Sequence, residues 1–180
     1  MIEYQEATPV SLADLEAFGW RIREFSGCTE DRWFPVSHFI EPGLQKLIGD
    51  NYSFEVHEIE DLGDRHGFAV PDDKLIALRL DVYHGVQENR GRDRMTAMHE
   101  VAHLFLHTKT TLSRRMSHAP PPPYRDPEWQ AKCLAGIILV PARMVPQDFD
   151  ALRVTREFGI SMDAAEIRLK QIRRFNSQKQ

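Results

Sequence analysis

Long hydrophobic runs are absent from this sequence of 180 residues. Crossing a bilayer takes about 18 consecutive apolar residues, and no stretch approaches that length. The N-terminal segment MIEYQEATPV also lacks the basic start and the apolar core of a signal peptide. We therefore expect a cytoplasmic protein that has no membrane partner.

Cysteine is scarce, and so is net positive charge. Cys28 and Cys133 are the two cysteines, which is too few for a disulfide scaffold, and neither belongs to a CxxC pair that would suggest a thiolate metal site. The net charge of -4 gives no overall attraction to nucleic acid, so such a contact would need a local basic patch. A chain of this length can bury the core of a single domain.

Apolar residues at helical spacing mark both ends of the chain. Ser11 resembles a helix cap ahead of a helix predicted over 12–25, and a second apolar set predicts a helix over 39–48. Near the C-terminus the pattern predicts one or two short helices, broken at 159–161. The last residues, 175–180, are expected to fray.

A period of two replaces the helical period in the middle of the chain. It predicts strands over 53–59, 67–70 and 74–83. Pro71 begins a turn signal between the last two segments, so we expect them to form a hairpin. The result is a small, mostly antiparallel sheet.

Two further helices flank a long polar segment. Asp93 is expected to cap a helix over 93–107, and Asp126, followed by a proline, is expected to cap a helix over 126–140. The segment 108–125 between them contains four consecutive prolines and no periodicity, so it is predicted to be a loop. Long loops within a compact domain are often functional.

These elements predict an α+β fold with one domain over 1–180. The small sheet packs against the 93–107 helix and the helix that follows it. N-terminal helices occupy 1–50, a catalytic core occupies 52–150, and a C-terminal helical segment occupies 151–175.

The 93–107 helix contains HEVAH at 99–103, an HExxH motif. Residues four apart on a helix differ by about 40° in direction and about 6 Å in height, so both imidazoles can bind one zinc ion. Glu100 points away from the pair and is placed to act as a general base on a water at the metal. The alternative is a buried helix face whose histidines bond to backbone or water.

A catalytic zinc needs a third protein ligand and one open position. His107 would lie about 9 Å along the helix axis from a metal between His99 and His103, so it is predicted to be a core residue or a partner of a ligand. We predict Glu128, because a capped helix start would aim its carboxylate at the HExxH helix. Asp126 competes but is expected to be engaged as the cap, and Glu128 would alternatively serve only the helix dipole.

Three blocks of the sequence resemble the ImmA/IrrE family of zinc metallopeptidases. RMTAMHEVAHLFLH (94–107) resembles the family's RFTxAHExxHxxLH block, and EWQAKCLAGIILVP (128–141) resembles its ExxANxFAxxLLMP helix. FGISMDAAEIRLKQI (158–172) resembles its FxVSxxAAxxRL segment. The blocks occur in the family's order over about the last hundred residues.

The resemblance implies a role for each matching residue. His99, His103 and Glu128 match the zinc ligands, and Glu100 matches the catalytic base. Arg94 matches the arginine that precedes the active-site helix, which makes it a candidate partner of the site.

Lys132 departs from the family pattern, which usually has Asn at this position. An Asn there is suited to orienting a histidine ligand, whereas a lysine cannot accept that hydrogen bond. Either another acceptor, such as a backbone carbonyl or Asp81, takes over, or the metal affinity is reduced.

If zinc is bound, it lowers the pKa of its water to about 7 and polarises the scissile carbonyl. Glu100 then takes the proton of the water and later gives it to the leaving amine. The tetrahedral oxyanion needs a further donor, and the loop over the site offers His118, Tyr124 and Arg125. The strand over 74–83, if it forms the sheet edge beside the cleft, would pair with an extended peptide.

The resemblance also implies a partner, because family members typically cleave a repressor of the helix-turn-helix class in stress response or phage defence. One alternative is a non-proteolytic antirepressor with a structural zinc. Another is a nucleic-acid-responsive regulator that uses basic residues of the last helix, which are Arg168, Lys170, Arg173 and Arg174. Cys28 is a candidate inhibitory thiolate at the open metal position, although a small buried thiol is the commoner role.

Overall fold

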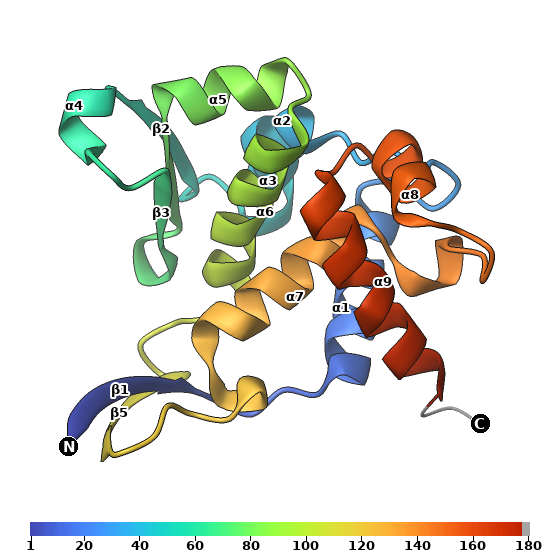
Figure 1. Cartoon of the computed structure of the whole chain (residues 1–180). Helices are drawn as coiled ribbons and strands as arrows, with labels where there is room; N and C mark the ends of the chain where they lie inside the picture. The colour runs from blue at the N-terminus through green and yellow to red at the C-terminus, as the bar shows by residue number, and fades with distance from the viewer. Residues whose placement is uncertain (178–180) are drawn as a thin grey trace.

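The computed structural model describes residues 1–177, and their fold is α+β, as the sequence predicts. Figure 1 shows the longer helices gathered together, a small sheet at one side of them and a separate strand pair at the N-terminus. The longer helices are α1 (Leu12–Phe25), α6 (Gly91–Leu106), α7 (Pro127–Leu139) and α9 (Met162–Ser177). None of the helices in the described range has the length and apolar character that a membrane span requires.

Helix α7 lies at the centre of the core and packs on both α1 and α6. The Asp126 side chain caps it as predicted, accepting a hydrogen bond from the Glu128 N–H at 2.9 Å. Its later side chains have no exposed surface, and these are Cys133, Leu134, Ala135, Ile137, Ile138 and Leu139. This apolar part anchors α7 in the core and leaves its first turn beside α6.

Helix α6 carries the HExxH motif, and its predicted extent is nearly correct. It begins at Gly91, so the prediction of Asp93 as its cap is wrong. The Asp93 carboxylate instead forms an ion pair with the Arg90 guanidinium, at 3.3 Å. This pair at i,i+3 takes the place of the predicted cap. Met98 and Val101 are fully buried, which fixes the helix against its neighbours.

The main sheet has three strands, β2 (Ser53–His57), β3 (Gly67–Val70) and β4 (Leu75–Arg79). β3 and β4 form the predicted hairpin through the short turn η2 (Pro71–Asp73), whereas β2 pairs with β4 in parallel. The strand order β2-β4-β3 places β4 in the middle and β3 at the edge. The expectation that the 74–83 strand forms the sheet edge is therefore wrong, because β2 covers its second side.

The predicted strand over 74–83 also ends early. β4 stops at Arg79, and helix α5 (Leu80–Gln87) follows directly. The alternation of β4 continues into Val82, but Val82 and Val86 also share one helical face, and both are buried. A short apolar run fits either period, and the packing of α5 on α6 selects the helix.

A second sheet consists of two strands, β1 (Ile2–Ala7) and β5 (Leu112–Ser117), paired antiparallel. The prediction of a loop over 108–125 is therefore wrong for β5, and the N-terminal strand was not predicted at all. Most of their side chains are exposed, so no apolar alternation marks them, and the partners are far apart in the sequence. The prolines follow β5, and the short turn η3 (Pro123–Arg125) leads into α7.

The N-terminal helices follow the predicted pattern. The Ser11 hydroxyl accepts a hydrogen bond from the Asp14 N–H at 3.1 Å and caps α1. The predicted 39–48 helix is present as a continuous helical segment, made of α2 (Val36–His38), the π-helical η1 (Phe39–Gly43) and α3 (Leu44–Ile48). Pro42 lies in the π-helical part because it has no N–H to donate to an ordinary α-helical bond.

The C-terminal helices are α8 (Ala151–Phe158) and α9, separated at the predicted break. Gly159 ends α8 with a φ of 67°, and a Cβ there would lie 2.3 Å from the Trp33 ring, so only glycine fits. α9 continues to Ser177 with Phe175 buried, so the predicted fraying does not begin at Phe175. Residues 178–180 lie outside the described range. Short helices complete the chain, namely α4 (Ile59–Leu62) and η4 (Ala142–Met144).

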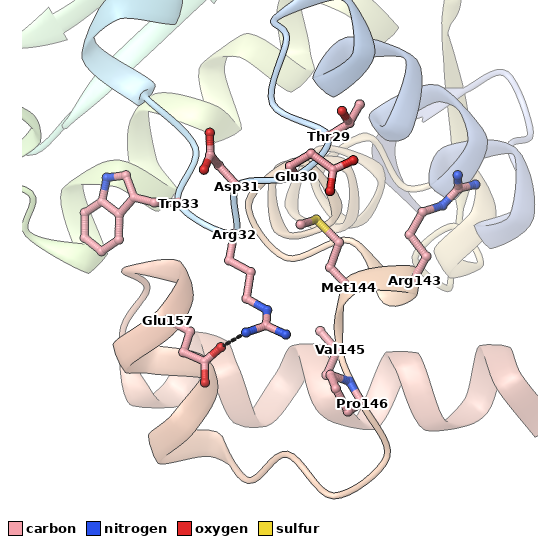
Figure 2. Close-up of a pocket in the computed structure, with 10 residues that line it drawn as sticks. All are labelled: Thr29, Glu30, Asp31, Arg32, Trp33, Arg143, Met144, Val145, Pro146 and Glu157. Carbon is pink, nitrogen blue, oxygen red and sulfur yellow. Dashed lines mark hydrogen bonds and ion pairs between the residues drawn. The ribbon is translucent and has the colours of Figure 1, made fainter.

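Figure 2 shows a cavity of about 1030 Å³ between the loop 29–33, the segment 143–146 and α8. Glu157 of α8 forms an ion pair with Arg32 across it. No residue of the predicted metal site lines this cavity. The chemistry predicted from the HExxH motif therefore belongs to another part of the molecule.

Candidate metal centre

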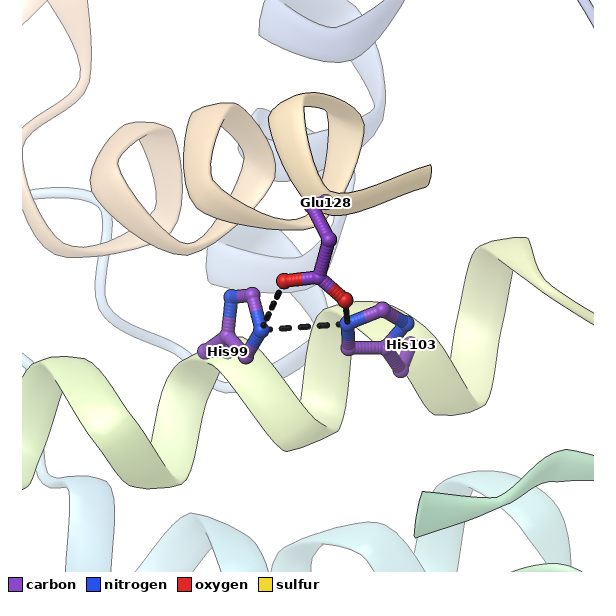
Figure 3. A group of neighbouring side chains, drawn as sticks. All are labelled: His99, His103 and Glu128. Carbon is purple, nitrogen blue, oxygen red and sulfur yellow. Dashed lines mark hydrogen bonds and ion pairs between the residues drawn. The ribbon is translucent and has the colours of Figure 1, made fainter. Parts of the chain in front are cut away.

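The three predicted ligands meet between α6 and α7. His99 and His103 lie one turn apart on α6, and Glu128 reaches them from the first turn of α7 (Figure 3). The two Nε2 atoms are 3.0 Å apart, and the Glu128 oxygens lie 3.3 Å from His99 Nε2 and 3.2 Å from His103 Nε2. Their carboxylate and imidazole atoms form a group that is able to hold a metal ion.

The separations are close to those around a tetrahedral zinc ion. With bonds of about 2.0–2.1 Å, ligand atoms at the corners of a tetrahedron stand about 3.3 Å apart. The two Nε2 atoms are 3.0 Å apart, and each faces a different Glu128 oxygen at 3.2 or 3.3 Å, while one ligand atom from each residue lies within 4.8 Å of the other two. Two imidazole nitrogens and a carboxylate are also a donor set of catalytic zinc sites, in which the fourth corner is left for water.

A chain of hydrogen bonds holds the His103 ring from behind. His103 Nδ1 lies 2.8 Å from His107 Nδ1, and His107 Nε2 lies 3.0 Å from Gln130 Oε1. The Gln130 amide is oriented by its NH2 group, which donates to the carbonyls of Thr8 and Tyr124 at 2.9 and 2.8 Å. We call this His103–His107–Gln130 chain the relay.

The proton positions of the relay follow from its geometry. Because the Gln130 NH2 faces two carbonyls, its Oε1 is an acceptor, and His107 Nε2 must donate to it. Burial lowers the pKa of His107 to about 4, so the ring is neutral and its Nδ1 accepts. His103 therefore donates from Nδ1, and its Nε2 faces Glu128.

The Glu128 carboxylate faces both histidines across the cleft. Hydrogen bonds from the His103 and His99 rings hold the pKa of the Glu128 carboxyl well below its usual range, so the carboxylate is ionised and only accepts. A hydrogen bond at 3.2 or 3.3 Å needs a proton on the imidazole Nε2. A metal cation bound by the three side chains would take the place of that proton, so the residues present fit a bound metal.

Glu100 lies on the α6 side that faces β3. A Cβ added to Gly67 would come within 3.3 Å of the Glu100 Cγ, which shows how closely the edge strand approaches this side chain. Burial raises the pKa of Glu100 to about 7, opposed by His103 and assisted by Glu128. A carboxyl with a pKa near neutrality is suited to accept and return a proton at pH 7.

Arg94 does not contact the metal ligands. Its buried guanidinium donates to the carbonyls of Phe34, Phe158 and Gly159 and lies over the Trp33 ring. The expectation that it is a partner of the site is therefore wrong. It ties the first turn of α6 to the end of α8.

The predicted oxyanion donors are not gathered at the metal ligands. Arg125 lies 3.8 Å from the Glu6 carboxylate, and the Tyr124 side chain is half exposed. His118 is exposed and makes no hydrogen bond within the described residues. Their assignment to the transition state stays a prediction.

Neither acceptor suggested to replace the family's Asn is used. Asp81 is paired with Arg79 at 2.7 Å, and the acceptor for His103 is His107 rather than a backbone carbonyl. Lys132 is exposed and has no hydrogen bond or ion pair within the described residues. For His99 Nδ1, no acceptor lies within hydrogen-bonding distance in that range.

Two other predicted roles involve residues that lie away from the cleft. Cys28 is buried at the end of α1, where its thiol lies 3.4 Å from the Ser26 carbonyl, and burial raises its pKa. Arg168 is buried and bonded to Glu16 and to the Val140 carbonyl at 2.8 Å. The proposed basic face of α9 therefore loses one of its four members.

Gln130 is a functional residue that the sequence reasoning missed. It is 2 % exposed and lies two residues after Glu128 on α7. A glutamine inside an otherwise apolar helix signals a buried amide that needs partners. One of those partners, the Thr8 carbonyl, is distant in sequence, and the other, the Tyr124 carbonyl, lies in the turn before α7.

A model of a known domain family, described as the IrrE N-terminal-like domain of the peptidase M78 group, matches residues 63–170. This range is more than half of the chain and includes β3, α6, the relay residues His107 and Gln130, and all three candidate metal ligands. No curated protein matches the sequence closely enough to be a recognisable relative.

Proposed function

Because the chain belongs to the ImmA/IrrE peptidase family, we propose that it is a zinc-dependent endopeptidase that cleaves a protein partner. The observation that carries this proposal is the convergence of His99, His103 and Glu128 between α6 and α7. The relay supports it, since it fixes the ring of one candidate ligand so that its Nε2 faces the other two.

Glu100 is the proposed catalytic residue. Zinc, when bound to the three ligands, supplies a Lewis acid that acidifies water and polarises a carbonyl. Glu100 accepts a proton from the attacking water at its carboxylate and returns it to the leaving amine. Its burial and its pKa of about 7 suit both halves of this transfer.

The free edge of β3 is the proposed docking place for the substrate backbone. β3 pairs only with β4 within the described residues, and it runs beside α6 close to Glu100. An extended peptide added to this edge would pass the catalytic carboxylate. This mode selects unfolded or loop segments, because their backbone N–H and C=O groups are free to pair with the edge of β3.

A helix-turn-helix repressor is the proposed partner, and this part rests on the family alone. We expect cleavage to relieve repression. A non-proteolytic antirepressor would bind the same partner without cutting it. A contact with nucleic acid is the weaker alternative, because burial of Arg168 leaves Lys170, Arg173 and Arg174 as the exposed cations of that set.

The test is to mix the purified chain with a helix-turn-helix repressor encoded beside it, with zinc and with a chelator. We expect two fragments that appear with zinc, disappear with chelator and are absent for Glu100→Gln. The matched control is Glu166→Gln, an exposed glutamate of α9 away from the cleft. Repressor that stays intact but loses its operator DNA with both the wild type and Glu100→Gln would favour the antirepressor and overturn the peptidase.

A further inference from the structure

A second cavity lies between α6, α7 and α9, and residues one helical turn from the candidate metal ligands help to line it. Thr96 lies one turn before His99, and Lys132 lies one turn after Glu128, and both line a cavity of about 310 Å³. One helical turn is about 5.4 Å, and a peptide residue spans about 3.3–3.6 Å. A side chain one or two residues from a scissile bond at the metal therefore reaches this cavity.

The walls of the cavity are mostly apolar. Met95 contributes from α6, Gly136 from α7, and Ile160, Ala164 and Ile167 from the start of α9 and the residue pair before it. A Cβ added to Gly136 would meet only the Arg168 side chain, at 3.6 Å, so the space opposite this glycine is open. Ile167 is 58 % exposed although it is large and apolar. A bulky apolar group that enters here would cover it.

The rim of the cavity is positively charged. Lys132 and Arg92 are exposed, and neither pairs with a carboxylate within the described residues. Within the described residues, the side chain of Arg92 makes one hydrogen bond, to His66 Nε2 at 3.1 Å. Arg168 also borders the cavity, but its charge is compensated by Glu16. Lys132 and Arg92 are therefore the cations available to a ligand.

We propose that this cavity is a specificity pocket for a substrate segment in which a bulky apolar residue stands next to an acidic one. The apolar side chain fills the space between Gly136 and Ile167, and the neighbouring carboxylate pairs with Lys132 or Arg92. Thr96 and Lys132 on its wall each lie one helical turn from a candidate metal ligand, which ties its occupant to the residues that flank the scissile bond. This inference rests on the proposed peptidase function.

The test measures peptide binding rather than cleavage. Zinc-loaded Glu100→Gln protein is titrated into four dye-labelled peptides of Gly, Ala and Ser that differ at two adjacent positions, which are Leu-Glu, Leu-Lys, Ser-Glu or Ser-Lys. We expect Leu-Glu to bind about tenfold tighter than Ser-Glu, because one apolar side chain gains a pocket. It should bind up to about fivefold tighter than Leu-Lys, because an exposed ion pair adds little more.

Variants in the same background locate the effect. Gly136→Leu fills the open space and should reduce Leu-Glu binding to the level of Ser-Glu, whereas Gly136→Ala is the matched control and should keep the preference. Ile167→Ser changes an exposed wall without a folding risk and should weaken the Leu preference about threefold. Lys132→Glu should shift the preference from Leu-Glu to Leu-Lys. Zinc content and thermal stability are checked for each variant.

Equal binding of Leu and Ser peptides, or a Leu preference that survives Gly136→Leu, would overturn the pocket, and so would absence of binding by all four peptides. The two proposals fail separately. A Leu-Glu preference in a protein that cleaves no repressor leaves the pocket and removes the peptidase. Repressor cleavage without an apolar preference does the reverse.

Discussion

The two ends of the cleft between α6 and α7 are built differently. At the His103 end, a buried relay runs through His107 and Gln130 to two backbone carbonyls, and every proton in it has one position. At the His99 end, no such chain is present within the described residues, and the exposed Lys132, one turn after Glu128, lines a mostly apolar cavity. The comparison teaches that one end orients the metal site and the other end is available to a ligand.

Glu100 gives the sharpest contrast with the relay, because it is equally buried but makes no hydrogen bond within the described residues. Its pKa in the folded protein is about 7 against an ordinary value of 4.5. Below pH 4.5 the carboxyl is protonated in both the folded and the unfolded chain, so it does not change the free energy of unfolding. Above pH 7 it is ionised in both, and its burial lowers the free energy of unfolding by the full value of the shift. In metal-free protein at pH 8, Glu100→Gln should stabilise the fold by about 3 kcal/mol, the value of that shift. Denaturant unfolding measures the gain.

The same measurement at pH 5 is the control, and most of the gain should vanish there. A gain of equal size at both pH values would show that Glu100 does not carry a raised pKa.

Breaking the relay should weaken metal binding at the His103 end. His107→Leu removes the acceptor for His103 Nδ1, and loss of such a partner lowers metal affinity by about 10–100-fold. His107→Gln keeps a side-chain acceptor and a side-chain donor at this position, so this variant should lose less zinc affinity. Zinc titration against a competing chelator distinguishes the two. Equal losses in both variants would mean that His107 matters only for packing.

Supplying a hydrogen-bond acceptor for His99 Nδ1, at the other end of the cleft, should strengthen zinc binding. Lys132→Asn restores the family residue one turn after Glu128, and its amide oxygen is expected to accept from His99 Nδ1. Zinc affinity should rise by up to about tenfold, the lower bound for a partner of this kind. Lys132→Leu, which removes the charge without adding an acceptor, is the control. A similar rise in Lys132→Leu would assign the effect to charge.

The smallest expected effect concerns the open space at Gly136. Gly136→Ala adds a Cβ at an ordinary contact distance of 3.6 Å from Arg168. Alanine in a helix interior is favoured over glycine by about 0.5–1 kcal/mol. Thermal unfolding should show a gain of this size with zinc affinity unchanged. A loss of stability would mean that the cavity wall is tighter than the structure indicates.

The sequence predicted which three side chains meet between α6 and α7, because their signals are local. HExxH needs only a helix, and Glu128 needs only a capped helix start, and both conditions were visible in residue spacing. The relay was not predictable beyond His107, because Gln130 is oriented by carbonyls that the pairing of β1 with β5 and the start of α7 bring together. Exposed strands carry no apolar alternation that would have revealed that pairing.

Two further errors have the same cause. The apolar positions from Leu75 to Val82 fit a strand throughout, but contacts of α5 with α6 make the second half helical. Which strand forms the sheet edge depends on whether β2 pairs with β4, and this pairing is set by tertiary contacts that the residue pattern does not show. The sheet edge beside Glu100 is therefore β3, a strand that was predicted with the correct bounds but not with this position.

The most direct test of the central claim is a zinc titration of wild type and Glu128→Gln in parallel. We predict one zinc per wild-type chain and at least a 100-fold weaker affinity in Glu128→Gln, because the third ligand is lost while His99 and His103 remain. An unchanged affinity in Glu128→Gln would contradict the account, since it would mean that the carboxylate from α7 does not hold the metal.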